Sequence, residues 1–541
     1  MRAMLRIALL LTGGVAMASE LPKTSAETTD YKSTSRYDEV IAFVRAIQSI
    51  DPGVRVETFA TTTEGRALPL VIVGPVGVVD PRSAHASGLP IVFIMANIHA
   101  GEVEGKEAAQ MLLRDLVSSQ RKLRSKLVVL IAPIYNADGN EKIATTHRTT
   151  QVGPMNGVGV RENAQGLDLN RDYMKLESPE ARGLVHNVLD RWDPLVTVDL
   201  HTTNGSYHGY QLTYSPMLTP NADPDLIDFE RETLLPEIRR QMKKRHGKET
   251  YYYGNFEDQL QPEKGWSTFD NRPRFGNNYV GLRNRFTILS EAYSYIDFQA
   301  RVEVTHQFIR EILDAVARHG MKMMGIAARA DERLRRGKLK KLGVRFKIKP
   351  WRENVPILWE RSTLAGPGKG IANPETGSGP PIVRSGVIVP MKMTDYGIFA
   401  ATEKSDVPSA FVIDARAKHV VENLLEHGIV VEHLNGPATL RVDQFVIGSV
   451  QHADHDFQKH HALTLTGKWK SGKVSFDAGT FIVRMNQPLA RLAFYLLDPR
   501  SDDGLFEWDF FDELLGDVAP VSKVMKVTPL NATLDVGPAA E

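Results

Sequence analysis

The chain of 541 residues contains no cysteine. Disulfide bonds, a cysteine nucleophile and a cysteine-based structural zinc site are therefore excluded, and a zinc ion would need histidine or carboxylate ligands. An excess of charge of one sign is also missing, because 66 lysines and arginines almost balance 65 aspartates and glutamates and leave a formal net charge of +1. This balance gives no indication of a nucleic-acid partner.

Long apolar runs are missing as well. No segment reaches the roughly 18 apolar residues that a membrane-spanning helix needs, so we predict no membrane span. A shorter apolar stretch over residues 7–18 follows the basic residues Arg2 and Arg6, and it ends on Ala16-Met17-Ala18. This pattern predicts a secretory signal peptide over residues 1–18, with an uncleaved interfacial helix as the alternative. We therefore expect an exported protein, either periplasmic or secreted.

Apolar strands and amphipathic helices alternate in the first part of the chain. Residues 19–36 are polar and predict a disordered lead-in, whereas residues 37–335 predict an α/β catalytic domain with a largely parallel sheet. The expected strands are Val71 to Val73, Ile91 to Asn97, Leu127 to Ala132, Leu195 to Leu200 and Arg285 to Ser290. The expected helices are Tyr37 to Ile50, Val103 to Leu116, Ser178 to Trp192 and Phe298 to Leu334.

The pattern changes in the last third of the chain. Residues 336–381 predict a basic strand followed by a linker rich in Gly and Pro. Residues 382–541 predict a mostly β accessory domain that is interrupted by one helix from Ala417 to His427. Its expected strands are Gly386 to Val389, Phe411 to Ile413, Ile429 to Glu432, Phe445 to Val450, Leu463 to Thr466, Phe481 to Met485 and Leu492 to Leu497.

Metal-binding side chains follow two of the predicted strands. One strand runs into the motif His99-Ala100-Gly101-Glu102, and another ends on His201. Because functional groups of parallel α/β sheets lie at the carboxyl ends of the strands, we expect these side chains to meet. Two histidines and a glutamate can hold zinc with one open position, where a bound water becomes nucleophilic near neutral pH. We therefore predict one Zn²⁺ per chain.

Together with further motifs, these residues resemble the zinc carboxypeptidase family, the carboxypeptidase A-like metallopeptidases, over roughly residues 37–320. The resemblance implies a zinc-carboxypeptidase-like α/β domain, with a mixed, largely parallel sheet flanked by helices. His99, Glu102 and His201 look like the zinc ligands of the family. The resemblance also implies that Glu291 is the general base, that Asp168 orients a zinc-bound histidine, that Asn170 and Arg171 bind the terminal carboxylate of the substrate, and that Arg161 stabilises the oxyanion.

The implied roles agree with elementary chemistry. A carboxylate that binds no metal, such as Glu291, can take a proton from water and return it to the leaving amine. The planar guanidinium of Arg171 can hold a carboxylate through two hydrogen bonds. An arginine beside the metal can stabilise a developing oxyanion, and Arg148 competes with Arg161 for this role. The resemblance thus implies a metallocarboxypeptidase that acts on a peptide or amide with a free carboxylate.

Two other functions remain open. A zinc amidase or deacylase could act on peptidoglycan stem peptides or N-acyl amino acids, because Asn170 and Arg171 would bind any suitable carboxylate. Alternatively, the chain is a non-catalytic binding protein whose accessory domain is the working part.

Several nearby residues have simpler interpretations than a catalytic or metal-binding role. Glu104 and Glu107 are interpreted as carboxylates behind the ligands or in solvent, and His208 as a residue that lines the cleft or has its hydrogen bonds satisfied in a loop. A tyrosine that closes over the substrate is a further feature of the family, and its candidates here are Tyr251, Tyr252, Tyr253 and Tyr279. A polar loop or a second metal site would explain His452, His455, His460 and His461.

Overall fold

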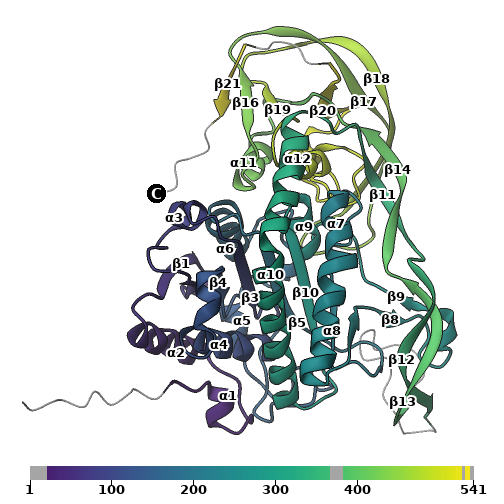
Figure 1. Ribbon diagram of the computed structural model, residues 1–541. Helices are drawn as coiled ribbons and strands as arrows, with labels where there is room; N and C mark the ends of the chain where they lie inside the picture. Colours follow the sequence, from purple (N-terminus) through teal and green to yellow (C-terminus); the bar gives the residue numbers. More distant parts are fainter. Residues whose placement is uncertain (1–20, 366–381, 527–530, 536–541) are drawn as a thin grey trace, which may run out of the picture.

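The computed structural model describes residues 21–365, 382–526 and 531–535 (Figure 1). The predicted signal peptide, residues 1–18, and the segment 366–381 of the predicted linker lie outside these ranges. Across the described residues, no helix combines the length and apolar character that crossing a membrane requires.

A mixed sheet of eight strands forms the centre of the front part of the chain, within the residues that the structure describes. Its parallel strands β4, β3, β5 and β10 lie side by side, and antiparallel pairs flank them. In spatial order the strands are β1 (Arg55–Thr61), β2 (Ala67–Val73), β4 (Val128–Ala132), β3 (Ile91–Ala96), β5 (Val196–Thr203), β10 (Phe286–Tyr293), β6 (Leu212–Ser215) and β7 (Thr250–Tyr252).

Both faces of the central strands β4, β3 and β5 are buried, which explains why β3 is apolar throughout. Alternate residues of β3 point to opposite faces, so Phe93 enters one hydrophobic cluster and Ile94 the other. The parallel register pairs Phe93 with Thr197 on β5 and Glu291 on β10 with His201. The carboxyl ends of three neighbouring strands therefore meet at one edge of the sheet.

Helices cover the two faces of the sheet (Figure 1). Those that contribute to one hydrophobic cluster are α2 (Tyr37–Ile50), α4 (Glu104–Val117), α7 (Pro224–Phe229), α8 (Leu235–His246) and α10 (Phe298–Arg335). The opposite face carries α6 (Pro179–Leu184), its π-helical continuation η3 (Val185–Asp190) and α9 (Gly276–Leu282). The predicted helix start at Ser178 is confirmed, since its hydroxyl accepts the Ala181 N–H at 3.1 Å. Shorter helices are α1 (Ser25–Thr28), α3 (Pro81–Ala86) and α5 (Ala137–Glu141).

The segment before α2 differs from the disordered lead-in that we predict for residues 19–36. Its described part contains α1 and is held by polar contacts. The buried carboxylate of Glu107 accepts hydrogen bonds from the Thr34 hydroxyl and from the Ser35 N–H and hydroxyl, at 2.7–2.9 Å. Arg114 forms a two-pronged ion pair with Glu27. Composition alone could not reveal this order, because much of it comes from buried hydrogen bonds of polar residues, besides the packing of Ala26 and Tyr31 against Phe298.

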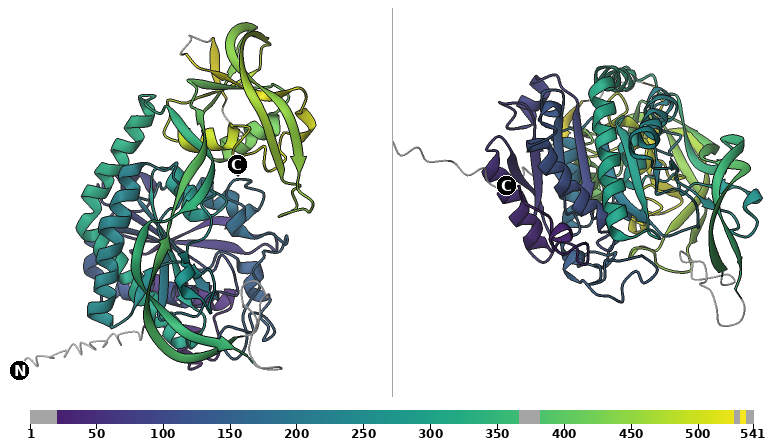
Figure 2. Two further views of the ribbon diagram at one scale, coloured as in Figure 1. Left: turned by 90° about the vertical axis from the view of Figure 1, so that its right-hand side faces the viewer. Right: turned by 60° about the horizontal axis from the view of Figure 1, so that its bottom comes forward.

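Long strands connect the front part to the C-terminal region and run along one side of the molecule (Figure 2). One two-stranded sheet consists of β11 (Lys341–Lys349) and β14 (Ile398–Asp406). A second sheet consists of β12 (Arg352–Leu364), β13 (Ile382–Tyr396), β9 (Trp266–Ser267) and β8 (Asn255–Phe256). Because β13 pairs with β9, the predicted boundary at residue 382 falls inside a sheet that includes strands of the front part.

The C-terminal region is built on a sheet of seven strands, counted over the described residues. In spatial order these are β18 (Leu463–Phe476), β17 (Ala438–His452), β20 (Val518–Val524), β15 (Ala410–Ile413), β19 (Phe481–Arg484), β16 (Val431–Leu434) and β21 (Ala532–Asp535). The predicted helix over Ala417 to His427 is confirmed as α11 (Lys418–Glu426). The predicted strand over Leu492 to Leu497 is wrong: these residues belong to the helix α12 (Ala490–Leu497). Every residue of α12 is buried, and a short apolar run of this kind does not reveal its periodicity.

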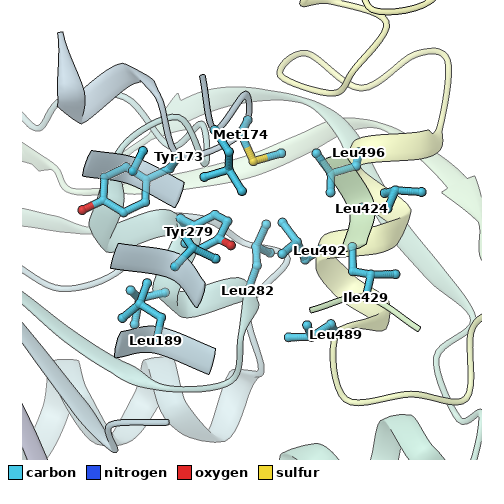
Figure 3. Packing of buried hydrophobic residues seen from close by; sticks show 14 of the residues in the cluster. Tyr173, Met174, Leu189, Tyr279, Leu282, Leu424, Ile429, Leu489, Leu492 and Leu496 are labelled. Atoms are coloured by element: carbon cyan, nitrogen blue, oxygen red, sulfur yellow. The ribbon is translucent and has the colours of Figure 1, made fainter. Parts of the chain in front are cut away.

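The front part and the C-terminal region share one buried hydrophobic cluster. Figure 3 shows Tyr279 and Leu282 of the front part on the side of Leu492 and Leu496 of α12, with Tyr173 behind them in the same cluster. Polar contacts join the same surfaces, since the Tyr279 hydroxyl lies 2.8 Å from His427 Nδ1. The accessory region is therefore packed onto the front part through a continuous core.

The close approach of α4 to β5 yields a first prediction. A Cβ atom at Gly105 would lie 2.6 Å from the Leu200 Cβ atom and 3.3 Å from the Leu200 carbonyl oxygen. Replacement Gly105→Ala must therefore push α4 from the sheet, and we expect a loss of about 1–3 kcal/mol and a lower thermal unfolding midpoint. Gly325→Ala on α10 is the control: its Cβ would meet only the end of Arg329 at 3.4 Å, and we expect stabilisation by about 0.5–1 kcal/mol. An unchanged midpoint for Gly105→Ala would contradict this account.

Candidate metal centre and binding cleft

Three ligand atoms converge at the carboxyl edge of the sheet. His99 and Glu102 lie in the loop between β3 and α4, and His201 lies on β5. Glu102 Oε1 is 2.9 Å from His99 Nδ1, and Glu102 Oε2 is 3.0 Å from His201 Nδ1. All three side chains are buried, and one ligand atom from each lies within 4.8 Å of the others. The structure thus brings together the three residues that the sequence predicts.

A second carboxylate lies behind each histidine. Asp168 Oδ1 is 3.0 Å from His99 Nε2, as expected for the residue that orients this ring. Asp199 Oδ2 is 2.9 Å from His201 Nε2, and sequence reasoning missed this partner. Its signal was available, because Asp199 and His201 are two residues apart on one strand and share a face. Each imidazole is therefore flanked by carboxylates at both of its nitrogens.

This arrangement fits a bound cation. A neutral imidazole has one N–H and one lone pair, so a ring whose Nε2 carries the proton, on the side of Asp168 or Asp199, points its Nδ1 lone pair at Glu102. Without a cation between them, the Nδ1 lone pairs of the two rings would face the Glu102 carboxylate oxygens, and neither side could donate a hydrogen bond unless the rings carried an extra proton. Burial alone would lower the pKa of His201, but Asp199 and Glu102 raise it well above its usual value. Two nitrogens and one carboxylate oxygen are a ligand set suited to zinc with an open position.

Glu291 lies beside this centre without belonging to it. The register of β10 and β5 pairs Glu291 with His201, and its side chain lines the same cleft. Burial raises the pKa of Glu291 to about 8; His201 opposes this rise, whereas Glu102 contributes to it. A carboxylate with a raised pKa beside a metal centre is a candidate for proton transfer.

Two arginines also lie beside the centre and line the cleft. The Arg148 guanidinium donates a hydrogen bond to Glu102 Oε1. Arg161 Nε donates to Asp168 Oδ2 at 2.9 Å, and Arg161 Nη1 lies 3.9 Å from Glu102 Oε1. Despite the burial of Glu102, which acts in the other direction, Arg148 and His99 hold its pKa well below the usual range. Arg148 and Arg161, the two alternatives that the sequence offers for stabilising an oxyanion, both line the cleft.

Asn170 and Arg171 form a second polar group in the same cleft, which has a volume of about 280 Å³. The Asn170 side-chain oxygen accepts the Gly276 N–H at 3.0 Å. The Arg171 guanidinium stacks on the Phe275 ring, with Cζ 3.9 Å from the ring centroid. The stacking fixes the plane of the guanidinium, whose Nη1 donates to the Asn170 carbonyl at 2.7 Å, and Arg171 lines the cleft. A guanidinium held in this way is suited to a carboxylate.

The tyrosine candidates and His208 differ in whether they reach the cleft. Of the four tyrosines, Tyr253 lines the cleft, whereas Tyr251, Tyr252 and Tyr279 are buried. His208 stacks on Tyr293 in the interior, where burial lowers its pKa to about 3.

The other acidic and histidine candidates serve as structural partners. Glu104 bonds to Thr202 and Arg301 behind the ligands. Over the described residues, only His99, Glu102 and His201 form a group able to hold a metal. The histidines near residue 460 therefore do not make a second site there.

Comparison with known proteins agrees with this geometry. Residues 40–271 match the family model described as zinc carboxypeptidase. The chain is 22% identical to carboxypeptidase 2 of Trichophyton tonsurans over 493 residues, which cover 85% of this chain and 81% of that protein. It is also 22% identical to carboxypeptidase 2 of Trichophyton rubrum over 465 residues, covering 80% of this chain and 76% of the relative. A solved metallo-carboxypeptidase from Burkholderia cenocepacia superimposes with a TM-score of 0.39 at 17% identity, over 52% of this chain and 70% of that chain. The predicted resemblance and fold class are confirmed.

The contact between Asp199 and His201 yields a second prediction. Asp199→Asn removes the charge that holds the His201 ring, so we expect zinc binding to weaken by roughly 10- to 100-fold. Competition with a chromophoric chelator measures this affinity. Thr197→Val is the control, because Thr197 is buried on the same face of β5, two residues earlier. Equal zinc affinity in Asp199→Asn and the wild type would remove Asp199 from the site.

Proposed function

We propose that this chain, whose residues 40–271 belong to the zinc carboxypeptidase family, is a metallocarboxypeptidase that hydrolyses the C-terminal peptide bond of peptides. The observation that carries the proposal is the meeting, in one cleft, of the ligand group with a non-ligand carboxylate and a carboxylate-binding pair. The ligand group is His99, Glu102 and His201; Glu291 is the carboxylate, and Asn170 and Arg171 are the pair.

Glu291 acts as the general base in this proposal. Zinc, when bound, would supply an acidified water and polarise the scissile carbonyl. The Glu291 carboxylate would accept a proton from the attacking water and give it to the leaving nitrogen. Its place beside His201, half-buried in the wall of the cleft, supports both transfers.

The arginines have two roles in this proposal, binding the substrate carboxylate and stabilising the oxyanion. Arg171, held flat on Phe275, binds the free carboxylate of the substrate together with Asn170. Arg161 faces the negative oxygen that develops on the scissile carbonyl. Arg148 is the alternative for this second task, since it contacts Glu102 more closely than Arg161 does. Asp168 and Asp199 hold the ligand rings and do not contact the substrate.

The substrate class has one competitor. The pair Asn170 and Arg171 would also bind the carboxylate of a peptidoglycan stem peptide or of an N-acyl amino acid, so an amidase or deacylase activity is the second candidate. Export to the periplasm or outside the cell, which residues 1–18 predict, would bring wall peptides within reach. The presence of the ligands, base and arginines argues against a non-catalytic binding protein.

Removal of the base gives the third prediction. We expect Glu291→Gln to bind zinc as the wild type does and to lose roughly 10²- to 10⁴-fold in kcat, because the amide cannot accept the proton. The measurement is mass spectrometry of a mixed peptide library, in which the wild type removes single C-terminal residues and a chelator stops it. Glu353→Gln, at an exposed position on β12, is the matched control.

Two results would redirect the proposal. Turnover by Glu291→Gln at the wild-type rate would rule out the role of Glu291. A wild type that binds zinc and leaves every peptide intact would favour the second candidate, and the same assay with muropeptides and N-acyl amino acids would then identify the substrate class.

Exchange of the carboxylate-binding arginine gives the fourth prediction. Arg171→Lys keeps the positive charge but loses the two-pronged contact and the stacking on Phe275. We expect KM to rise roughly 10- to 100-fold, which corresponds to one lost charged hydrogen bond of about 1.5–3 kcal/mol. Peptides with an amidated C-terminus, which lack the carboxylate, should no longer distinguish the variant from the wild type. Arg310→Lys on α10 is the control, and an unchanged KM for free peptides would contradict the role of Arg171.

A further inference from the structure

The hairpin of β17 and β18 extends from the accessory sheet toward the front part (Figure 2). We call residues 453–462, which connect these strands, the hairpin tip. The side-chain oxygen of Gln458 in this tip accepts the backbone N–H of Asp168 at 2.8 Å. Asp168 is the carboxylate that holds His99, so a residue of the accessory region touches the support of a metal ligand.

Independent contacts hold the tip in place. His460 is buried and bonds with Nδ1 to Asp509 at 2.7 Å and with Nε2 to Glu177 of the front part at 2.8 Å. Gln458 and Lys459 both have positive φ values, of 53° and 67°. Non-glycine residues adopt this conformation at a cost that surrounding contacts must offset. The position of Gln458 is therefore set by the tip and by the front part together.

The contacts of Asp168 form a short relay. Its N–H is fixed by Gln458, and its Oδ1 accepts the Asn170 N–H at 2.9 Å. Oδ1 also faces His99 Nε2, while Oδ2 receives Arg161. Each of these groups needs the carboxylate in one orientation. A shift of the Asp168 backbone would thus reach the ring of His99, the carboxylate-binding pair and the oxyanion arginine at once.

A second contact from the accessory region reaches the other wall of the cleft. Asp503 accepts the Arg274 N–H at 2.5 Å and Nε–H at 2.6 Å. The Arg274 guanidinium also lies over Trp508, 4.4 Å from the ring centroid. The next residue, Phe275, is the ring on which Arg171 stacks. The accessory region therefore supports both the metal side and the carboxylate side of the cleft.

We propose that Gln458 is a positioning residue of the metal centre, through which the accessory region completes the active site of the front part. This inference rests on the proposed function. Gln458 does not touch the ligands; it acts through Asp168. Loss of its acceptor oxygen leaves the partly buried Asp168 N–H without this partner and frees the carboxylate to turn.

The test compares two substitutions at one position in the full-length protein. Gln458→Met keeps the length of the side chain and loses the acceptor oxygen, whereas Gln458→Glu keeps an acceptor oxygen. We expect Gln458→Met to bind zinc roughly 3- to 10-fold more weakly, less than the 10- to 100-fold typical of a direct partner of a ligand. Its kcat should fall with little change in KM, and Gln458→Glu should recover most of both losses.

The matched control is Gln451→Met, the same replacement at an exposed position on β17. Zinc affinity is measured by chelator competition and the kinetic constants with a cleavable peptide. Wild-type zinc affinity in Gln458→Met, or equal losses in Gln458→Met and Gln458→Glu, would overturn the role of Gln458. A wild type that binds zinc but cleaves no peptide would overturn the proposed function alone, because the zinc measurement still decides this inference.

Discussion

The pairing of each imidazole with a buried carboxylate is the constraint on which the rest of the site depends. Asp168 and Asp199 lie behind His99 and His201, and in this way both Nδ1 atoms are directed at Glu102. The cost of burying these charges is offset only where the groups meet a cation or a proton. Arg161 and the contact from the hairpin tip keep Asp168 in its orientation, whereas Asp199 is held by the strand that also carries His201.

Much of the candidate site could be predicted from the sequence, because its chemistry lies at the ends of apolar strands. His99, Glu102, His201 and Glu291 follow from that pattern and from the order of the motifs, and the structure brings them into one cleft. Gln458 could not be predicted: it lies 290 residues from Asp168 along the chain, and a single glutamine in a polar loop has no local signature. Contacts of this kind follow from tertiary packing, which hydrophobic periodicity does not encode.

The fold, too, could be predicted from the sequence only in part. The alternation of strands and helices predicts the α/β sheet, since each element buries an apolar face. Two parts escape this reasoning for opposite reasons. The segment around Ser35 is ordered by hydrogen bonds to Glu107 although it is polar, and α12 is so completely buried that its apolar run carries no helical period. A short apolar run that is wholly buried indicates burial but does not distinguish a strand from a helix, and a polar segment gives no sign of the hydrogen bonds that order it.

The shared core of the two regions also bears on how such a protein can change over generations. The apolar side chains of Tyr279 and Leu282 pack against α12 (Figure 3), so a gene fusion or deletion that exchanged the C-terminal third would leave them facing water. A replacement would have to provide a matching apolar surface and a polar tip of the right reach at the same time. We therefore expect the two regions to be inherited together as one unit, because changes in the surface of either region are constrained by the surface of the other.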